Sequence, residues 1–243
     1  MKLDILAIGA HPDDVEISCG GTILAAIAQG KKVGIVDLTQ GELGTRGTAQ
    51  TRKIEATNAA KVLGVAIRIN LEMADGFFVN DETHQKKIIE IIRLYKPDII
   101  FCNAPEDRHP DHGRSSKLVE DAAFLSGLVK IETQDENGNL QEKHRPSYIF
   151  HYIQDRYLQP NFVMDISDFQ EKKMEALQCY NTQFFNENST EPSTYISSPL
   201  FLETIKARAM MLGKRIGVTY AEGFISEKIL GIKNFDAFIA NPT

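Results

Sequence analysis

The chain has 243 residues, of which 42% are hydrophobic, 25% charged and 8% aromatic, and its formal net charge is -6. Such values are ordinary for a globular protein with enough chain to bury a sizeable core. The charge balance argues against a nucleic-acid-binding surface, and no stretch reaches the roughly 20 apolar residues of a membrane span. The first residues become charged too early for a signal peptide, so we expect a cytoplasmic protein.

In the first half of the chain, short apolar runs alternate with helical patterns. The apolar runs predict buried strands at 3–9, 32–39, 65–71 and 98–104. The segments between and after them predict helices at 20–32, 49–64, 81–97 and 114–128. Thr48 is the expected N-cap of the second helix and Gly64 its end. Four alternations of strand and helix predict an α/β fold, Rossmann-like, with a mostly parallel sheet and helices on both faces.

The second half of the chain is less regular. Its apolar runs predict strands at 147–153 and 161–167, and its helical patterns predict helices at 168–180 and 200–217. The remaining stretches predict a polar, exposed excursion at 132–146, a long loop at 184–199 and a tail at 218–224. For the long loop, a plain connection is favoured over a mobile flap. We expect one domain over residues 1–243.

Two loops carry histidines and aspartates directly after predicted strands. The sequence "AHPDD" follows the first strand and "RHPDH" follows the fourth. In open parallel sheets, ligands bind beyond the carboxyl ends of the strands, so we expect both loops at one edge, close together where the strand order reverses. The side chains concerned are His11, Asp13, Asp14, His109, Asp111 and His112.

Nucleotide-binding motifs are missing from these positions. A dinucleotide site needs G-x-G-x-x-G after the first strand, where this chain has "GAHPDD". Asp37, at the end of the second strand, is therefore interpreted as a helix or loop cap rather than a ribose ligand. The glycine-rich "GELGTRG" lacks the Gly-Lys-Ser/Thr ending of a phosphate-binding loop.

Two histidines with a carboxylate are a typical ligand set for a catalytic zinc, which keeps one position open for water. Adjacent carboxylates point in different directions, so one of Asp13 and Asp14 would bind the metal and the other would act as general base. Two other classes remain open. A non-catalytic metal-binding module would not need the second carboxylate, and a metal-dependent phosphoesterase would normally hold two ions.

The motifs "AHPDDVEISCGG" and "HPDH" are complete and occur in this order, with the predicted strands between them. On these motifs the chain resembles the LmbE-like (PIG-L) family of zinc-dependent N-deacetylases, which act on N-acetylglucosamine conjugates. The metal ligands that the resemblance implies, for one Zn²⁺ per chain, are His11, Asp14 and His112. Asp13 would be the general base, and His109 would polarise the acetyl carbonyl and stabilise the oxyanion. Asp111 would orient an imidazole.

The resemblance also implies substrate contacts. Arg52 and Asp75 match positions that grip sugar hydroxyls, and Arg108 lies beside the histidines, where it can reach a carboxylate bidentately. Each also has a structural interpretation: a helix-surface arginine, a turn aspartate and a loop-bracing arginine.

Four segments, "DLTQGELGTRGT", "TRKIEA", "NAPEDRHPDHG" and "GVTYAEGF", are most similar to the bacillithiol-biosynthesis branch of the family. The expected substrate is then N-acetylglucosaminyl-L-malate, with another N-acetylglucosaminide or a thiol conjugate as the alternative. Arg46, Arg52 and Arg108 are expected to offset the two carboxylates of malate. The resemblance further implies a homo-oligomer, a trimer or a hexamer.

Overall fold

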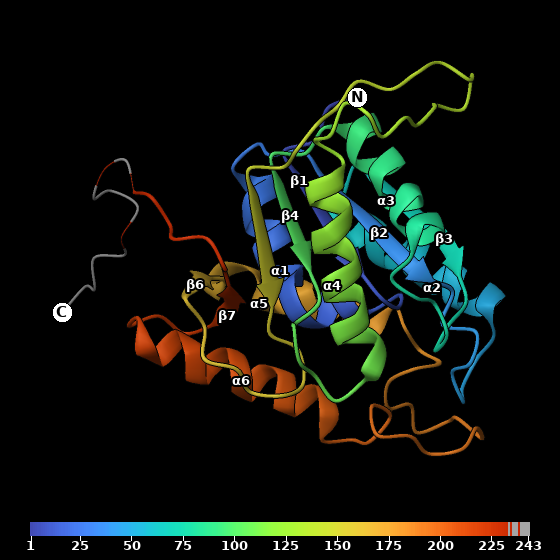
Figure 1. Ribbon diagram of the computed structural model, residues 1–243. Helices are drawn as coiled ribbons and strands as arrows, with labels where there is room; N and C mark the ends of the chain where they lie inside the picture. The colour runs from blue at the N-terminus through green and yellow to red at the C-terminus, as the bar shows by residue number, and fades with distance from the viewer. Residues whose placement is uncertain (233, 235–237, 239–243) are drawn as a thin grey trace.

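The computed structural model describes residues 1–232, 234 and 238, and within them seven strands form one sheet in the order β3-β2-β1-β4-β5-β7-β6 (Figure 1). The strands are β1 (Ile5–Gly9), β2 (Val33–Thr39), β3 (Ile67–Met73), β4 (Ile99–Cys102), β5 (Tyr148–Tyr152), β6 (Phe162–Asp165) and β7 (Ala221–Ile225). The first five strands pair in parallel, and β7 is antiparallel to β5 and to β6. The predicted α/β fold with a mostly parallel sheet is confirmed.

Helices cover both faces of the sheet (Figure 1). They are α1 (Asp14–Ala28), α2 (Ala49–Leu63), α3 (Glu82–Tyr95), α4 (Pro110–Leu125), α5 (Gln170–Gln178) and α6 (Phe201–Arg215). Helices α3 and α4 bury leucines, isoleucines and valines against one face, and α1 and α5 pack on the other. None of the described helices is long and apolar enough to cross a membrane.

The centre of the sheet is the pair β1 and β4. Strand β1 pairs with β2 on one side and with β4 on the other, through Ile5 opposite Val33 and Ile5 opposite Ile99. The strand order therefore reverses between β1 and β4, and their carboxyl ends lie side by side. This is the position at which open α/β sheets form binding sites.

Helix α1 begins at Asp14, six residues before the predicted start at residue 20. The predicted start matches the segment that follows a break at Cys19, whose φ of −139° and ψ of 17° are not helical, and the prediction missed the segment before this break. In the structure a side chain at Gly21 would place its Cβ only 2.8 Å from Ile166. Close packing therefore explains the glycine at this position, and residues 10–13 connect β1 to the helix.

Helix α4 also begins earlier than predicted, at Pro110 instead of residue 114. His109 is its N-cap and its ring Nδ1 accepts the backbone N–H of Asp111 at 3.3 Å. Proline at the first helical position is favourable because its missing N–H would have no partner there. Asp111 and His112 thus lie in the first turn of a helix and not in a loop.

The other predictions agree with the structure in type. Thr48 caps α2 by accepting the N–H of Thr51, and Gly64 ends that helix with a φ of 75°. The predicted tail at 218–224 is wrong in part because Ala221–Ile225 forms β7. Glu222 in this strand is buried, with its Oε1 at 2.6 Å from Nζ of Lys173. Figure 1 places the 132–146 excursion beyond the end of the sheet opposite the carboxyl ends of β1 and β4.

Candidate active site

A cavity of about 230 Å³ lies beyond the carboxyl ends of β1 and β4. The residues predicted from the two motifs meet there: His11, Asp13, Asp14, His109 and His112 line the cavity, and Asp111 lies behind it against His11. Arg52, Asp75 and Arg108 line it too. The structure therefore brings these predicted residues together, whereas Arg46, which was also expected near the substrate, does not line the cavity.

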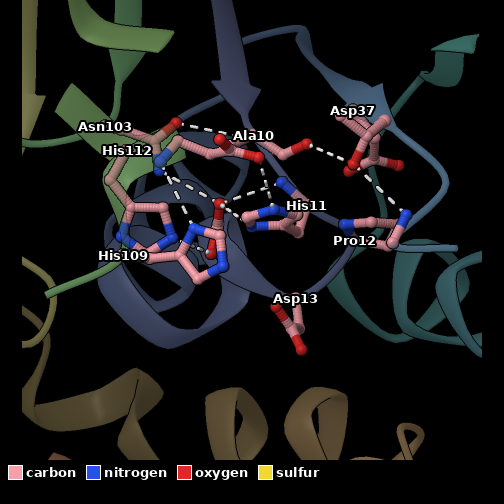
Figure 2. A network of polar contacts seen from close by, with 12 residues as sticks. Ala10, His11, Pro12, Asp13, Asp37, Asn103, His109 and His112 are labelled. Atoms are coloured by element: carbon pink, nitrogen blue, oxygen red, sulfur yellow. Dashed lines mark hydrogen bonds and ion pairs between the residues drawn. The ribbon is translucent and has the colours of Figure 1, made fainter. Parts of the chain in front are cut away.

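Three imidazoles form the centre of the site (Figure 2). The ring centroids of His11 and His109 are 4.6 Å apart, those of His109 and His112 are 5.3 Å apart, and those of His11 and His112 are 5.6 Å apart. One nitrogen of each ring lies within 4.8 Å of the others. His11 follows β1, whereas His109 and His112 lie at the start of α4, which follows β4, so the cluster forms only when β1 and β4 are adjacent.

Asp14 lies between two of these imidazoles. Its Oδ2 is 3.5 Å from Nδ1 of His11, and its Oδ1 is 3.2 Å from Nε2 of His112. Burial raises the pKa of Asp14, but His112 and His11 lower it more, so the pKa lies well below its ordinary value. Asp14 is therefore ionised and suited to a cation.

Asp13 faces away from the rings in Figure 2, and its Oδ2 lies 3.3 Å from Nη1 of Arg52. Burial raises the pKa of Asp13, the positive charge of Arg52 lowers it, and the negative charge of Asp14 raises it. The resulting pKa is about 7. A carboxylate with this pKa can both accept and return a proton near neutrality, which are the requirements for a general base. The two adjacent aspartates thus differ in environment.

His11 has partners that orient its ring. Its Nε2 lies 3.1 Å from Asp75 and 3.4 Å from Asp111, and its Nδ1 faces Asp14. Asp75 and Asp111 also accept backbone N–H groups, from Leu43 and Gly76 respectively. Carboxylates beyond a ligating imidazole fix its tautomer and orientation, which is the role expected of Asp111. Asp75 shares this position against His11, in addition to its predicted contact with sugar.

His112 has an equivalent partner that the sequence analysis missed. Its Nδ1 lies 2.5 Å from Oδ2 of Asp107, whose Oδ1 accepts the N–H of Arg156 at 2.7 Å. Burial lowers the pKa of His112, but Asp14 and Asp107 raise it to about 9. The only sequence signal for Asp107 is an acidic residue two positions before the "HPDH" motif.

His109 differs electrostatically from the other two histidines. Burial lowers its pKa, and the charges of His11 and His112 lower it further. Because Nδ1 accepts the N–H of Asp111, the neutral ring carries its proton on Nε2. His109 is thus a neutral hydrogen-bond donor, as a group that meets a developing oxyanion needs to be.

The arginines near the site differ in what they contact. Arg52 is buried and donates to the carbonyl of Pro12 at 2.6 Å and to Gln183 at 2.6 Å, besides its contact with Asp13. Arg108 is 45% exposed, donates through Nε to Asp155 at 3.1 Å and lies 4.3 Å from the ring centre of Tyr195. Arg52 is therefore held against Asp13, whereas Arg108 reaches solvent.

Asp37 has a structural role, as expected, but the interpretation of it as a helix or loop cap is wrong because its carboxylate is paired with Arg68. Its carboxylate pairs with Arg68 through two bonds, Oδ2 to Nε at 2.8 Å and Oδ1 to Nη2 at 2.9 Å. The pair joins β2 to β3 beside α1, where Arg68 also reaches Glu16.

The side chains in the cavity fit a divalent cation of the zinc type. Imidazole nitrogens and carboxylate oxygens are zinc ligands, and one nitrogen from each of His11, His109 and His112 lies within 4.8 Å of the others. A second group with the same spacing joins His11 to Asp75 and Asp111. Several buried carboxylates surround the histidines, so a cation would offset their mutual repulsion.

The chain is similar to known proteins over most of its length. The family model described as PIG-L, GlcNAc-PI de-N-acetylase, matches residues 6–123. A diacetylchitobiose deacetylase from Thermococcus kodakarensis is 31% identical over 229 residues, which are 90% of this chain and 81% of that protein. A conserved protein from Thermus thermophilus has a similar structure, with a TM-score of 0.83 at 34% identity, covering 95% of this chain and 98% of that chain.

A further solved structure extends the likeness in fold. The 4-carboxy-2-hydroxymuconate hydratase from Pseudomonas putida KT2440 gives a TM-score of 0.78 at 20% identity, covering 97% of this chain and 100% of that chain. At this identity the likeness concerns the fold alone. The motifs, the family model and the relative that spans most of the chain agree, and the chain belongs to the PIG-L (LmbE-like) deacetylase family.

Proposed function

We propose that this protein is a metal-dependent hydrolase that removes the acetyl group from an N-acetylglucosamine conjugate. One observation carries the proposal: a buried carboxylate with a pKa of about 7, Asp13, lies in the same cavity as His11, Asp14 and His112, whose neighbouring side chains suit a cation. The relative from Thermococcus kodakarensis, a diacetylchitobiose deacetylase, supports the reaction class.

The side chains suit hydrolysis of an amide, which resists attack by neutral water. A zinc ion held by His11, Asp14 and His112 would supply a Lewis acid for the carbonyl and for water. Asp13 accepts the proton of the attacking water, and Nε2–H of His109 donates to the acetyl oxygen as negative charge develops on it. Asp13 can then return its proton to the departing amine.

For the substrate we propose N-acetylglucosaminyl-L-malate. The four segments that are similar to the bacillithiol-biosynthesis branch favour this conjugate. Arg108 supports it because its guanidinium lines the cavity and reaches solvent. A guanidinium presents a planar fork that suits a carboxylate such as those of malate. Arg46, which was also expected to contribute, instead donates to the carbonyl of Phe184 and to Ser189 in the 184–199 loop.

Diacetylchitobiose is a second candidate because the relative from Thermococcus kodakarensis, which matches 90% of this chain, is a diacetylchitobiose deacetylase. The pairing of Arg108 with Asp155 favours this candidate too, because it neutralises charge at the cavity and so suits an uncharged sugar.

The test is a comparison of substrates with zinc-loaded protein, in which the freed amine is measured. A charge-assisted contact is worth about 1.5–3 kcal/mol, so the malate conjugate should exceed free N-acetylglucosamine by roughly 10–150-fold in kcat/KM. Equal or faster cleavage of diacetylchitobiose would refute the malate assignment and leave the deacetylase class in place. Binding of two ions per chain with phosphate ester cleavage would instead indicate a phosphoesterase.

A further inference from the structure

The carboxylate of Asp14 is held by three hydrogen bonds from neutral donors, besides its contacts with two imidazoles. Its Oδ2 accepts the backbone N–H of His11 at 2.9 Å and the side-chain amide of Asn103 at 3.0 Å. Its Oδ1 accepts the side-chain amide of Gln154 at 2.5 Å. Asn103 is 0% exposed and Gln154 is 4% exposed, so water does not compete for these bonds.

The two carboxamides are themselves fixed in orientation. Oδ1 of Asn103 accepts the backbone N–H of Ala10 at 2.9 Å, which leaves its amide nitrogen to face Asp14. That nitrogen also lies 3.2 Å from Oε1 of Gln154, so the amide nitrogen of Gln154 faces Asp14 too. The backbone N–H of Ala10 fixes the orientation of the Asn103 amide, which in turn fixes that of Gln154. Neither amide can flip without losing a buried hydrogen bond.

Three neighbouring parallel strands contribute to this arrangement. Asp14 follows β1, Asn103 directly follows β4, and Gln154 follows β5. The backbone carbonyl of Asn103 is in turn bound by the ring of His151, at 2.9 Å. The sheet therefore fixes the carboxylate from three sides.

We propose that Asn103 and Gln154 are positioning residues that hold the Asp14 carboxylate ready for the cation; this rests on the proposed function, which makes Asp14 a metal ligand. Amide donors are suited to the task because they orient a carboxylate without adding positive charge, whereas a lysine or arginine in their place would repel the ion. An ionised carboxylate has about four acceptor sites, so the three donors leave one, which a metal would take once His11 and His112 bind that metal and no longer Asp14.

The main test replaces Gln154 by methionine, which has similar length and no donor. Partners of metal ligands typically contribute 10–100-fold to metal affinity. We therefore expect Gln154→Met to raise the Kd for Zn²⁺ by about 10–100-fold, measured by competition with a chromophoric chelator. The absorption spectrum of bound Co²⁺ should shift as well, because a carboxylate that is free to turn changes the ligand field.

The matched control is Gln170→Met. Gln170 is 3% exposed on α5, and its side-chain amide has no hydrogen-bond partner among the described residues. The same replacement in an equally buried place should leave the Kd and the Co²⁺ spectrum at wild-type values. If Gln154→Met does not fold, as judged by thermal unfolding, Asn103→Ser tests the other donor, since serine is too short to reach Asp14.

Two results would overturn the inference, and they differ in what else they remove. If Gln154→Met or Asn103→Ser folds and binds Zn²⁺ as tightly as Gln170→Met does, the positioning role is refuted and the proposed function stands. If Asp14→Asn retains wild-type affinity for Zn²⁺, Asp14 is not a ligand, and the ligand set of the proposed function fails together with the inference.

Discussion

Asp13 adopts a backbone conformation that is rare for aspartate, with φ 116° and ψ −26°. Non-glycine residues in such regions typically lose about 1–3 kcal/mol, and they concentrate at functional sites. Asp13 occupies the N-cap position of α1, but its side chain makes no capping hydrogen bond to this helix. Strain, burial and the neighbouring charge of Asp14 all destabilise the fold at this residue, as expected when its role is chemical.

Replacing Asp13 by glycine and by alanine separates strain from charge. Both variants lose the buried carboxylate, but only glycine adopts a φ of 116° without steric conflict. Asp13→Gly should therefore have a higher free energy of unfolding than Asp13→Ala, by about 1 kcal/mol or more, in urea unfolding. Equal stability of the two variants would show that the backbone at Asp13 is not strained.

Metal content tests the assignment of the individual ligands. His11→Ala, Asp14→Ala and His112→Ala should each abolish stoichiometric zinc, because each removes one of three ligands. Asp13→Ala and His109→Gln should retain it, because neither side chain is assigned to the metal. Elemental analysis of the purified variants distinguishes the cases. Loss of zinc in Asp13→Ala with retention in Asp14→Ala would mean that the two carboxylates have been exchanged.

How far sequence could predict this site depends on the residue type. Histidines and aspartates at strand ends have a direct chemical signal, and those predicted line one cavity, except Asp111, which lies behind it against His11. Asp107, Asn103 and Gln154 were missed because they contact the side chains of His112 and Asp14 and would not themselves contact metal or substrate. An amide such as Gln154 has no signal in sequence, since its role depends on β5 lying beside β4.

At the scale of elements, the types were predictable and two starts were not. The buried strands and α2 carry strong local signals: apolar runs, the Thr48 cap and the Gly64 end. The starts of α1 and α4 were misplaced because each helix begins within one of the two motifs that carry the predicted site residues. Polar residues there are buried by contacts across the sheet, which periodicity cannot reveal.

The contact between β5 and α4 gives a prediction about pH. His151 on β5 lies 3.0 Å from Glu120 on α4. Burial lowers the pKa of His151, but Cys102, Glu120 and the Asn103 carbonyl raise it to about 11. A histidine whose pKa is raised on folding stabilises the fold fully below its unfolded pKa of about 6.5, and this contribution falls as pH rises toward the folded value.

His151→Gln should consequently lower the free energy of unfolding more at about pH 6 than at about pH 10. Urea unfolding of wild type and variant at both pH values measures the difference. A loss that is the same at both, or larger at the higher pH, would show that His151 is not stabilised in its charged form.

At the scale of the whole molecule, the architecture positions the site without fixing its reaction. A hydratase shares this fold at low identity, so the reaction class has to be inferred from the site and the family. The sheet accounts for why residues from β1, β4 and β5 meet. The proposed chemistry follows from the side chains placed there.

Assembly is a prediction of the family resemblance that the single chain leaves open. Helix α6 exposes Met210 by 49% and Met211 by 39%, and Leu200 before it is 70% exposed. Apolar side chains of this kind suit an interface between copies. We expect sedimentation at micromolar concentration to show a trimer or a hexamer; a species of 27.2 kDa would be the monomer and would contradict this prediction alone.

The central claim is that Asp13 is the base of a zinc-dependent deacetylation, and one paired measurement tests it. Amine release from N-acetylglucosaminyl-L-malate and diacetylchitobiose is measured with wild type and Asp13→Asn, both checked for zinc. The wild type should release amine from at least one of them, and Asp13→Asn should keep its zinc and lose about 10²–10⁴-fold in kcat. A zinc-loaded wild type without activity, or an Asp13→Asn enzyme with near-normal kcat, would contradict the account.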